Sequence, residues 1–370
     1  MRTIEERIAG GRLTIDLGAL ASNWHRLAAK SAPAECAAVV KANAYGLGIE
    51  HAVPALVEAG CRTFFVALLD EAIRVRASAP DATIYVLNGV FGEALDVYRA
   101  HGIRPVIGSI EDARLLAATG PLAAALHIDT GMTRLGLSVA EAEWLACDDL
   151  RGALDLQLIM THYACADDLN HPKTDRQFLA FEMIADAFPG VRRSVGNSAA
   201  TFAGGDHRTD LTRPGVALYG GEALNNVPNG SAPVVTLEGR IVQLREVDAG
   251  ETVGYGGTVT LTRRTKIAIV SVGYADGFSR AAGGGVPMRA VAAAAHGWIA
   301  GTNVPLLGRV SMDLTAYDVT DVPSIAQGDW VEMFGPHVPI DDVARAAGTI
   351  GYELLTGLGT RFARTYIPAS

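Results

Sequence analysis

Short apolar runs alternate with longer amphipathic segments over roughly the first 230 residues of the chain. The apolar runs are four to six residues long and mostly rich in aliphatic and aromatic residues, which is typical of buried strands. Eight such runs end near Lys41 (CAAVVK), Ala67 (TFFVA), Leu87 (TIYVL), Ile107 (RPVI), Ile128 (AAALHI), Met160 (LQLIM), Val195 (RRSV) and Val216 (RPGV).

The segments between these runs carry apolar residues at helical spacing. They include residues 49–59, 93–100, 111–118 and 138–146, and Ser109 and Ser138 stand where helix N-caps are expected. Eight strands, each followed by a helix-like stretch, predict an α/β fold with a (β/α)8 TIM-like barrel. A doubly wound open sheet uses similar units and is the alternative, but no GxGxxG follows the first strand.

The pattern changes after Gly230. Six further strands are predicted there, separated by Gly, Asp and Pro with almost no helix between them, and one late helix is expected around residues 340–347. We therefore expect a barrel over residues 12–231 and a mostly-β C-terminal domain over residues 232–370, with residues 1–11 packing with the latter. The six strands are Val234–Leu244, Thr258–Leu261, Lys266–Val272, Val304–Leu307, Leu314–Val319 and Trp330–Phe334.

Composition and charge narrow the class of protein. The net charge of −9 and the lack of a run of five like charges argue against a nucleic-acid binder. No run of 18 apolar residues appears, and the first twelve residues hold five charges, so we expect neither a membrane span nor a secretory signal. The four cysteines form no CxxC pair, which favours free thiols and a cytoplasmic location.

Lysine is scarce, with four lysines against 27 arginines, and only Lys41 stands at the end of a predicted barrel strand. A strand-end lysine that reaches solvent is one interpretation. The other is a Schiff-base lysine, desolvated so that its neutral amine attacks an aldehyde.

Other polar residues follow other strands, at the end of a barrel where reactive groups gather. Arg134 follows the fifth strand and His162 the sixth; no spacing around His162 is typical of a metal site, so no metal is expected. Asn197-Ser198 and Arg213-Pro214-Gly215 occupy the loops after strands seven and eight, where barrels often bind phosphate. Together with an upstream lysine, these loops indicate a phosphorylated aldehyde cofactor.

In this order, the segments resemble the alanine racemases, which are barrel-type pyridoxal-phosphate (PLP) enzymes. The resemblance runs from Leu13 to Tyr366 and covers nearly the whole chain. It is carried by VVKANAYGLG (39–48), DTGMTRLG (129–136), RPGVALYG (213–220), VGYGGT (253–258), VGYADG (272–277), RVSMD (309–313) and GYELLTGLGTRFARTY (351–366).

The resemblance implies roles for individual residues. Lys41 would be the Schiff-base lysine and one of two catalytic bases, and Tyr255 the opposing base, contributed by the β domain of a second subunit; a homodimer with shared active sites follows. A hydrogen-bonded chain would run from Tyr255 through His162 to Arg213, which would face the pyridine nitrogen. The remaining cofactor-binding residues would be Tyr45, Asn197, Ser198, Gly215, Val216 and Tyr352, and the substrate-binding residues Arg134, Met312, Tyr274 and Asp313.

Three positions depart from the family's pattern. Some members carry a carbamylated lysine where this chain has His127, so what positions Arg134 is left open. Thr133 stands in place of a glycine or asparagine and Ser311 in place of a cysteine, and we expect both to be tolerated.

The reaction implied is the interconversion of L- and D-alanine, a small-molecule amino-acid substrate, supplying D-alanine for peptidoglycan. A broader-specificity racemase, a serine racemase or a related PLP decarboxylase stays an alternative on the same framework. A non-catalytic PLP carrier is disfavoured by the residues beyond Gly230, and a metal-dependent aldolase by the lack of a His-x-Cys pair in the β domain.

Overall fold

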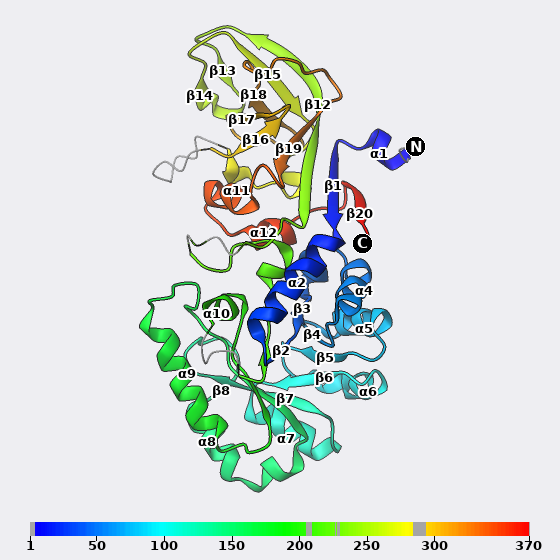
Figure 1. The fold of residues 1–370 in the computed structure, drawn as a ribbon, viewed down its shortest axis with the longest axis vertical. Coiled ribbons are helices and arrows are strands. Elements are labelled where there is room, and N and C mark those ends of the chain that lie inside the picture. The colour runs from blue at the N-terminus through cyan, green and yellow to red at the C-terminus, as the bar shows by residue number, and fades with distance from the viewer. Residues whose placement is uncertain (1–3, 205–208, 226, 228–229, 284–293, 370) are drawn as a thin grey trace. The chain divides into compact units, whose positions relative to one another are not determined.

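The computed structural model describes residues 4–204, 209–225, 227, 230–283 and 294–369. Contacts within the chain divide it into two compact units, both drawn in Figure 1. One unit, called the barrel below, comprises Leu20–Ala232; the other, called the β domain, comprises Met1–Ala19 and Pro233–Ser370.

Parallel strands form the wall of the barrel. Their order is β3 (Ala38–Val39), β4 (Thr63–Val66), β5 (Thr83–Val86), β6 (Arg104–Ile107), β7 (Ala124–Asp129), β9 (Leu156–Met160) and β10 (Arg192–Ser194). Apart from the first residues of β9 and β10, these strands are mostly buried, as expected for a parallel sheet covered on its outer face.

A short eighth strand closes the ring. β11 (Leu211–Thr212) pairs in parallel with β2 (Glu35–Cys36), which precedes β3 directly. On its other side, Asp210 N–H donates to the Arg193 carbonyl (3.1 Å) and Arg213 N–H to the Gly196 carbonyl (2.7 Å). The predicted TIM-like barrel is therefore confirmed, and the open sheet is wrong.

The eighth strand ends earlier than predicted. We expected the RPGV run to be a strand ending near Val216, whereas β11 ends at Thr212 and the chain enters a 3-10 turn, η4 (Val216–Tyr219). Pro214 has no N–H with which to continue a ladder. The other strand ends lie within two residues of their predicted positions.

Helices follow the strands as predicted, and two caps are confirmed. Ser109 Oγ accepts from Asp112 N–H (3.1 Å), and Ser138 forms a reciprocal capping box with Glu141. Lys173 lies in the first turn of α9. The helical elements of the barrel are α2 (Leu17–Ser31), α3 (Lys41–Tyr45), α4 (Ile49–Ala59), α5 (Leu69–Ser78), η1 (Gly92–Ala94), α6 (Leu95–Ala100), α7 (Ile110–Thr119), α8 (Val139–Cys147, after the short strand β8, Leu137–Ser138), η2 (Asp149–Ala153), α9 (Pro172–Ala185) and α10 (Ser198–Ala203).

The β domain is built on one curled, mainly antiparallel sheet. Its strand order is β15 (Thr265–Val270), β18 (Thr315–Asp318), β17 (Thr302–Leu307), β16 (His296–Ile299), β19 (Trp330–Phe334), β12 (Val235–Val247), β1 (Gly11–Asp16) and β20 (Ala363–Ile367), and β12 also pairs with β15. The late helix is confirmed as α11 (Ile340–Ala347). The smaller elements are α1 (Ile4–Ile8), the hairpin β13 (Thr252–Val253) and β14 (Val259–Thr260), the turns η5 (Tyr255–Gly257), η6 (Tyr274–Asp276) and η7 (Arg280–Ala282), and α12 (Gly351–Thr356).

The first strand departs from the expected boundary at residue 12. β1 pairs antiparallel with β12 and parallel with β20, so it belongs to the β domain. Its burial alternates strictly, with Leu13 and Ile15 fully buried and their neighbours partly exposed. Such alternation suits a sheet with one covered face, whereas the barrel strands are buried on both.

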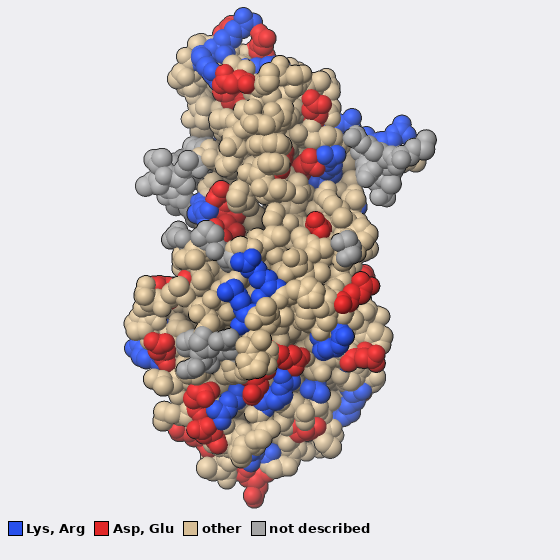
Figure 2. Space-filling model, in the orientation of Figure 1, with Lys and Arg blue, Asp and Glu red and all other residues tan. Residues whose placement is uncertain are grey.

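The surface carries no large region of one charge on the face shown in Figure 2, where acidic and basic side chains are interspersed. Ion pairs such as Arg263–Asp321 (2.6 Å) are part of this pattern. Among the described helices, none is both long enough and apolar enough to cross a lipid bilayer.

Candidate active site

Lys41 lies two residues after the end of β3 and is partly exposed. Burial lowers the pKa of its amine, the charge of Arg134 lowers it further, and Glu71 opposes both. A lysine with a lowered pKa supplies more neutral amine near neutrality, which is the nucleophilic form.

The chain after Lys41 adopts a left-handed turn. Ala42, Asn43, Ala44 and Tyr45 all have φ between 52° and 57°, although none is glycine. A left-handed conformation costs an L-residue roughly 1–2 kcal/mol, so four in succession store considerable strain. Strain of this kind persists where the surrounding structure over-determines it, and it gathers at functional sites.

Tyr45, Ser198 and Gly215 meet beside this turn. Gly215 N–H donates to Ser198 Oγ (2.8 Å), and a Cβ at Gly215 would lie 2.3 Å from the Tyr45 hydroxyl oxygen. The Tyr45 ring stacks on Tyr219, with ring centroids 4.4 Å apart. Val216 begins η4, and the first N–H groups of a helical turn lack intrahelical acceptors.

This group of hydroxyls and N–H groups fits a phosphate. Asn197 supports it indirectly, because its side-chain oxygen caps α10 by accepting from Ala200 N–H (3.0 Å) and so orients Ser198 at the start of that helix. The site offers hydrogen-bond donors, and Gly215 has no side chain that would fill the space beside them. These two properties suit the phosphate group of PLP.

Arg213 is a buried cation held by neutral acceptors. It donates to the Thr161 carbonyl (2.6 Å) and to the Ser194 hydroxyl, and it lies over the Phe65 ring (5.9 Å to the centroid). Burial lowers the pKa of Arg213 to about 10, so the guanidinium is still protonated near neutrality. A buried donor that stays charged suits an unprotonated pyridine nitrogen.

Imidazoles near Arg213 are kept neutral. Burial, followed by the charges of Arg213 and Arg134, holds the pKa of His162 well below its usual range. Burial and Arg213 lower the pKa of His127 to about 4. The His127 Nε2 atom is buried and has no hydrogen-bond partner among the described residues.

Arg134 lies in the loop between β7 and β8 and is exposed. Asp129 Oδ1 shapes this loop by accepting from Gly131 N–H (2.8 Å) and Thr133 N–H (3.0 Å). Burial raises the pKa of Asp129, but these and neighbouring backbone donors outweigh it and lower the pKa overall. Thr133 has a φ of 58°, which is an unfavourable conformation for a β-branched residue. A threonine at this position therefore carries a conformational cost.

The other predicted residues lie in the β domain. Tyr255 stands in η5 between two glycines of positive φ, and its side chain is 68% exposed. Tyr274 N–H donates to the Ser311 carbonyl (3.0 Å), next to Met312. The contact of Ser311 with Tyr274 is thus made by its backbone, which a serine provides as well as a cysteine.

Asp313 and Tyr352 complete this second group. Asp313 pairs with Arg361 (2.9 Å), which also binds the buried Asp276 (2.6 Å), and Tyr352 is exposed on α12. The structure therefore gathers the predicted residues into two groups, one in the barrel and one in the β domain.

Several residues of the barrel group were missed from the sequence. Buried Gln177 donates to the His162 carbonyl (3.0 Å) and accepts from Ala164 N–H (2.9 Å), and Glu71 lies against the turn after Lys41. Thr161 and Ser194 stand at the ends of strands that the apolar pattern located. Their position at these strand ends could therefore have identified them as candidates. Gln177 and Glu71 lie on helices, and no local pattern distinguishes them.

Comparison with known proteins identifies relatives of the whole chain. Models of the "Alanine racemase, N-terminal domain" and "Alanine racemase, C-terminal domain" match residues 15–223 and 234–366. The biosynthetic alanine racemase of Agrobacterium fabrum is 49% identical, over 97% of this chain and 94% of that protein. An alanine racemase of Rhizobium meliloti is 48% identical, over 99% of both.

Solved structures agree with these relatives. An alanine racemase from Bartonella henselae with covalently bound pyridoxal phosphate has a TM-score of 0.88 at 36% identity, covering 97% of this chain and 100% of that one. The biosynthetic alanine racemase from Pseudomonas aeruginosa has a TM-score of 0.87 at 36% identity, covering 98% and 100%.

Proposed function

The chain belongs to the alanine racemase family and is an amino-acid racemase; from that premise, we propose that it binds PLP at Lys41 and interconverts L- and D-alanine with two bases, Lys41 and Tyr255. The observation that carries the proposal is the position of Lys41. This lysine stands at the reactive end of the barrel, with a lowered pKa, beside a phosphate-sized group of donors.

The barrel group supplies the contacts that PLP needs. Lys41 would hold the cofactor covalently, while Tyr45, Ser198, Gly215 and Val216, with Asn197 behind Ser198, would bind its phosphate. Arg213 would donate to the pyridine nitrogen. When bound, PLP withdraws electrons from the substrate's α-carbon and so acidifies the α-proton.

Inversion requires proton transfer on two faces. One base removes the α-proton on one side, and an acid returns a proton on the other side; a single group would restore the original configuration. The lowered pKa of Lys41 suits it to the first task. The exposed phenol of Tyr255 suits a group offered to another molecule. Neutral His162 would link it to Arg213.

Substrate recognition falls to the remaining residues. The exposed guanidinium of Arg134 and the Met312 amide would orient the carboxylate of alanine, which a planar cation binds well. Tyr274 and Tyr352 would narrow the entrance, with Tyr352 also reaching the phosphate, and Asp313 would support them through Arg361. We expect the reaction to be cytoplasmic and its D-alanine to supply peptidoglycan.

A homodimer with shared sites follows from this assignment, and subunit mixing tests it. Lys41→Ala and Tyr255→Ala should each be inactive as pure dimers. After exchange at equal concentration, mixed dimers hold one doubly damaged site and one intact site, so about a quarter of the wild-type activity should return.

Two measurements make this result decisive. Subunit exchange is verified by co-purification of differently tagged variants, and wild-type protein mixed with Lys41→Ala serves as the control for dilution. If exchange occurs and no activity returns, Tyr255 does not serve the partner's Lys41, and the shared site is wrong.

A further inference from the structure

We propose that Glu71, in the first turn of α5, is a positioning residue for Lys41. Its buried carboxylate connects the left-handed turn that follows Lys41 to the residues that follow β4. The inference rests on the proposed function only in taking Lys41 as the reactive amine. No role for Glu71 follows from the sequence motifs, and its contacts join segments that are distant along the chain.

The carboxylate makes three hydrogen bonds to backbone N–H groups. Glu71 Oε1 accepts from Asn43 N–H (3.0 Å), within the turn, and Oε2 accepts from Ala67 N–H (3.0 Å) and Leu68 N–H (3.2 Å), after β4. The side chain is only 7% exposed. Three donors directed at two oxygens fit an ionised carboxylate, which is an acceptor only.

These bonds connect two neighbouring strands at their reactive ends. β3 and β4 pair in register, Ala38 with Phe64 and Val39 with Phe65, and Val40 N–H continues the ladder to the Phe65 carbonyl (2.9 Å). Beyond that point the ladder stops, because the chain turns left-handed. Glu71 bridges the gap that this turn opens between the strands.

A second support holds the outer side of the turn. Asn43 Oδ1 accepts from Ile49 N–H (3.1 Å) and from the Arg74 guanidinium (2.6 Å), which also pairs with Glu50 (2.7 Å). The Arg74–Glu50 pair is exposed, so water and salt weaken it. The buried bonds of Glu71 are screened less, and we therefore assign the main restraint to Glu71.

Glu71 is also the negative charge that acts on Lys41. Burial and the positive charge of Arg134 favour the neutral amine, and His162 lies close enough to be affected by the lysine's charge. Among the described groups that act on Lys41, Glu71 is the one that favours its protonated form. The same carboxylate therefore restrains the turn that follows Lys41 and opposes the loss of the proton from its amine.

Replacement by glutamine tests both effects. Glu71→Gln keeps the shape, removes the charge, and turns one of the two oxygens into an NH₂ group facing an N–H donor. In the full-length chain freed of cofactor, reductive methylation with ¹³C labels the four lysines and the α-amine, and Lys41→Arg identifies the Lys41 signal by NMR. We expect the pKa of Lys41 to fall in Glu71→Gln.

Amide exchange of the enzyme as purified reports on the turn. Hydrogen exchange at Asn43 should accelerate by about tenfold or more in Glu71→Gln, because one hydrogen bond to a charged acceptor is lost. Glu71→Asp keeps the charge but shortens the reach. In that variant, exchange at Asn43 should accelerate while the pKa of Lys41 stays near the wild-type value.

Glu35→Gln is the matched control. Glu35 also accepts from two groups, the Thr63 hydroxyl (2.5 Å) and Arg192 (2.8 Å), but at the opposite end of the barrel. The Glu35→Gln substitution should leave both hydrogen exchange at Asn43 and the pKa of Lys41 unchanged. The proposal is overturned if Glu71→Gln behaves as wild type in both, if Glu35→Gln alters them equally, or if Glu71→Asp lowers the pKa of Lys41 as far as Glu71→Gln. None of these readouts requires racemisation, so they are independent of the subunit-mixing test.

Discussion

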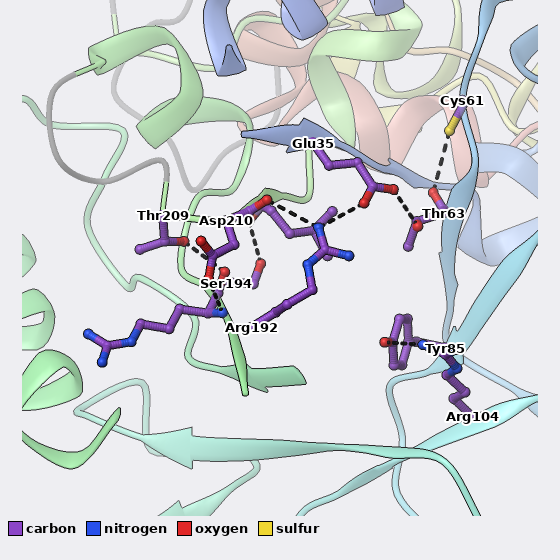
Figure 3. A network of polar contacts seen from close by, with 11 residues as sticks. Glu35, Cys61, Thr63, Tyr85, Arg104, Arg192, Ser194, Thr209 and Asp210 are labelled. Carbon is purple, nitrogen blue, oxygen red and sulfur yellow. Dashed lines mark hydrogen bonds and ion pairs between the residues drawn. The ribbon is translucent and has the colours of Figure 1, made fainter. Parts of the chain in front are cut away.

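At the end of the barrel where the strands begin, opposite charges are paired with one another (Figure 3). Arg192 binds Glu35 (2.8 Å), the Thr63 hydroxyl donates to the same carboxylate, and Arg193 N–H donates to Asp210 (2.8 Å). At the other end, where the strands finish, the acceptors of Arg213 among the described residues are neutral, and a strained turn follows Lys41.

The difference shows how one scaffold separates stability from reactivity. The beginning of each strand is a place where polar groups can satisfy each other without consequence for chemistry. At the end where the strands finish, the hydrogen-bond donors and cations are those that we propose bind the cofactor and the substrate. Substitutions at the two ends should therefore change different quantities.

The largest effect is expected from Lys41→Arg, which keeps a positive charge but removes the titratable amine. The racemisation rate should fall by about 10³-fold or more, because the proposed proton-transfer group and the proposed attachment point of the cofactor are both lost. Circular dichroism of alanine solutions measures the rate. Lys30→Arg, at the end of α2, is the control, and a Lys41→Arg enzyme within tenfold of wild type would contradict the assignment.

His127 should make this end of the barrel sensitive to acid. Its folded-state pKa of about 4 lies below the unfolded value, so the neutral imidazole stabilises the fold above pH 6.5, and this contribution is lost as the pH falls toward 4. The loss amounts to about 3 kcal/mol. In urea unfolding at pH 7 and at lower pH, His127→Gln should lose less stability than wild type; parallel losses would refute this.

Arg134→Lys should weaken substrate binding more than turnover. An ammonium cannot bind a carboxylate with two parallel hydrogen bonds, so kcat/KM should fall by about ten- to a hundredfold, mostly through KM. Steady-state kinetics with L- and D-alanine measure this effect. Arg99→Ala is the control, since Arg99 donates to the carbonyls of Thr119 (2.8 Å) and Gly120 (3.1 Å) and to the Thr119 hydroxyl (3.4 Å), all at the end of α7; an unchanged KM in Arg134→Lys would count against the carboxylate role.

The smallest effect is expected from Arg192→Ala at the paired end. Breaking its partly exposed ion pair with Glu35 should lower the free energy of unfolding by about 1 kcal/mol, while kcat stays within about twofold of wild type because no reacting group is touched. Thermal unfolding and the racemisation assay are run on the same preparation. A large loss of kcat without a loss of stability would contradict the view that the end where the strands begin serves stability alone.

The sequence allowed the barrel to be predicted because its strands are unbroken apolar runs, and a polar residue marks where several of them finish. Lys41 and His162 were found in this way. Motif order then located the β-domain residues, including Tyr255, that no periodicity would have singled out.

Long-range arrangements could not be predicted by these means. The left-handed turn contains Ala42 and Ala44, which have no local preference for such a conformation, and Glu71 holds it from 28 residues away. β20 was missed as a strand because its stability depends on β1, at the other end of the chain. These features arise from contacts whose partners are not neighbours in sequence.

The pairing of β1 also has a consequence for the order of events during synthesis. β1 is translated before both of its neighbours: the antiparallel one is complete only at residue 247 and the parallel one only at residue 367. Because domains tend to fold as units while the chain emerges, the whole barrel can assemble before this strand has any partner. The nascent chain must therefore carry a half-apolar strand with two free edges until β12 has been made and with one free edge until β20 has been made, so this sheet can be completed only after residue 367.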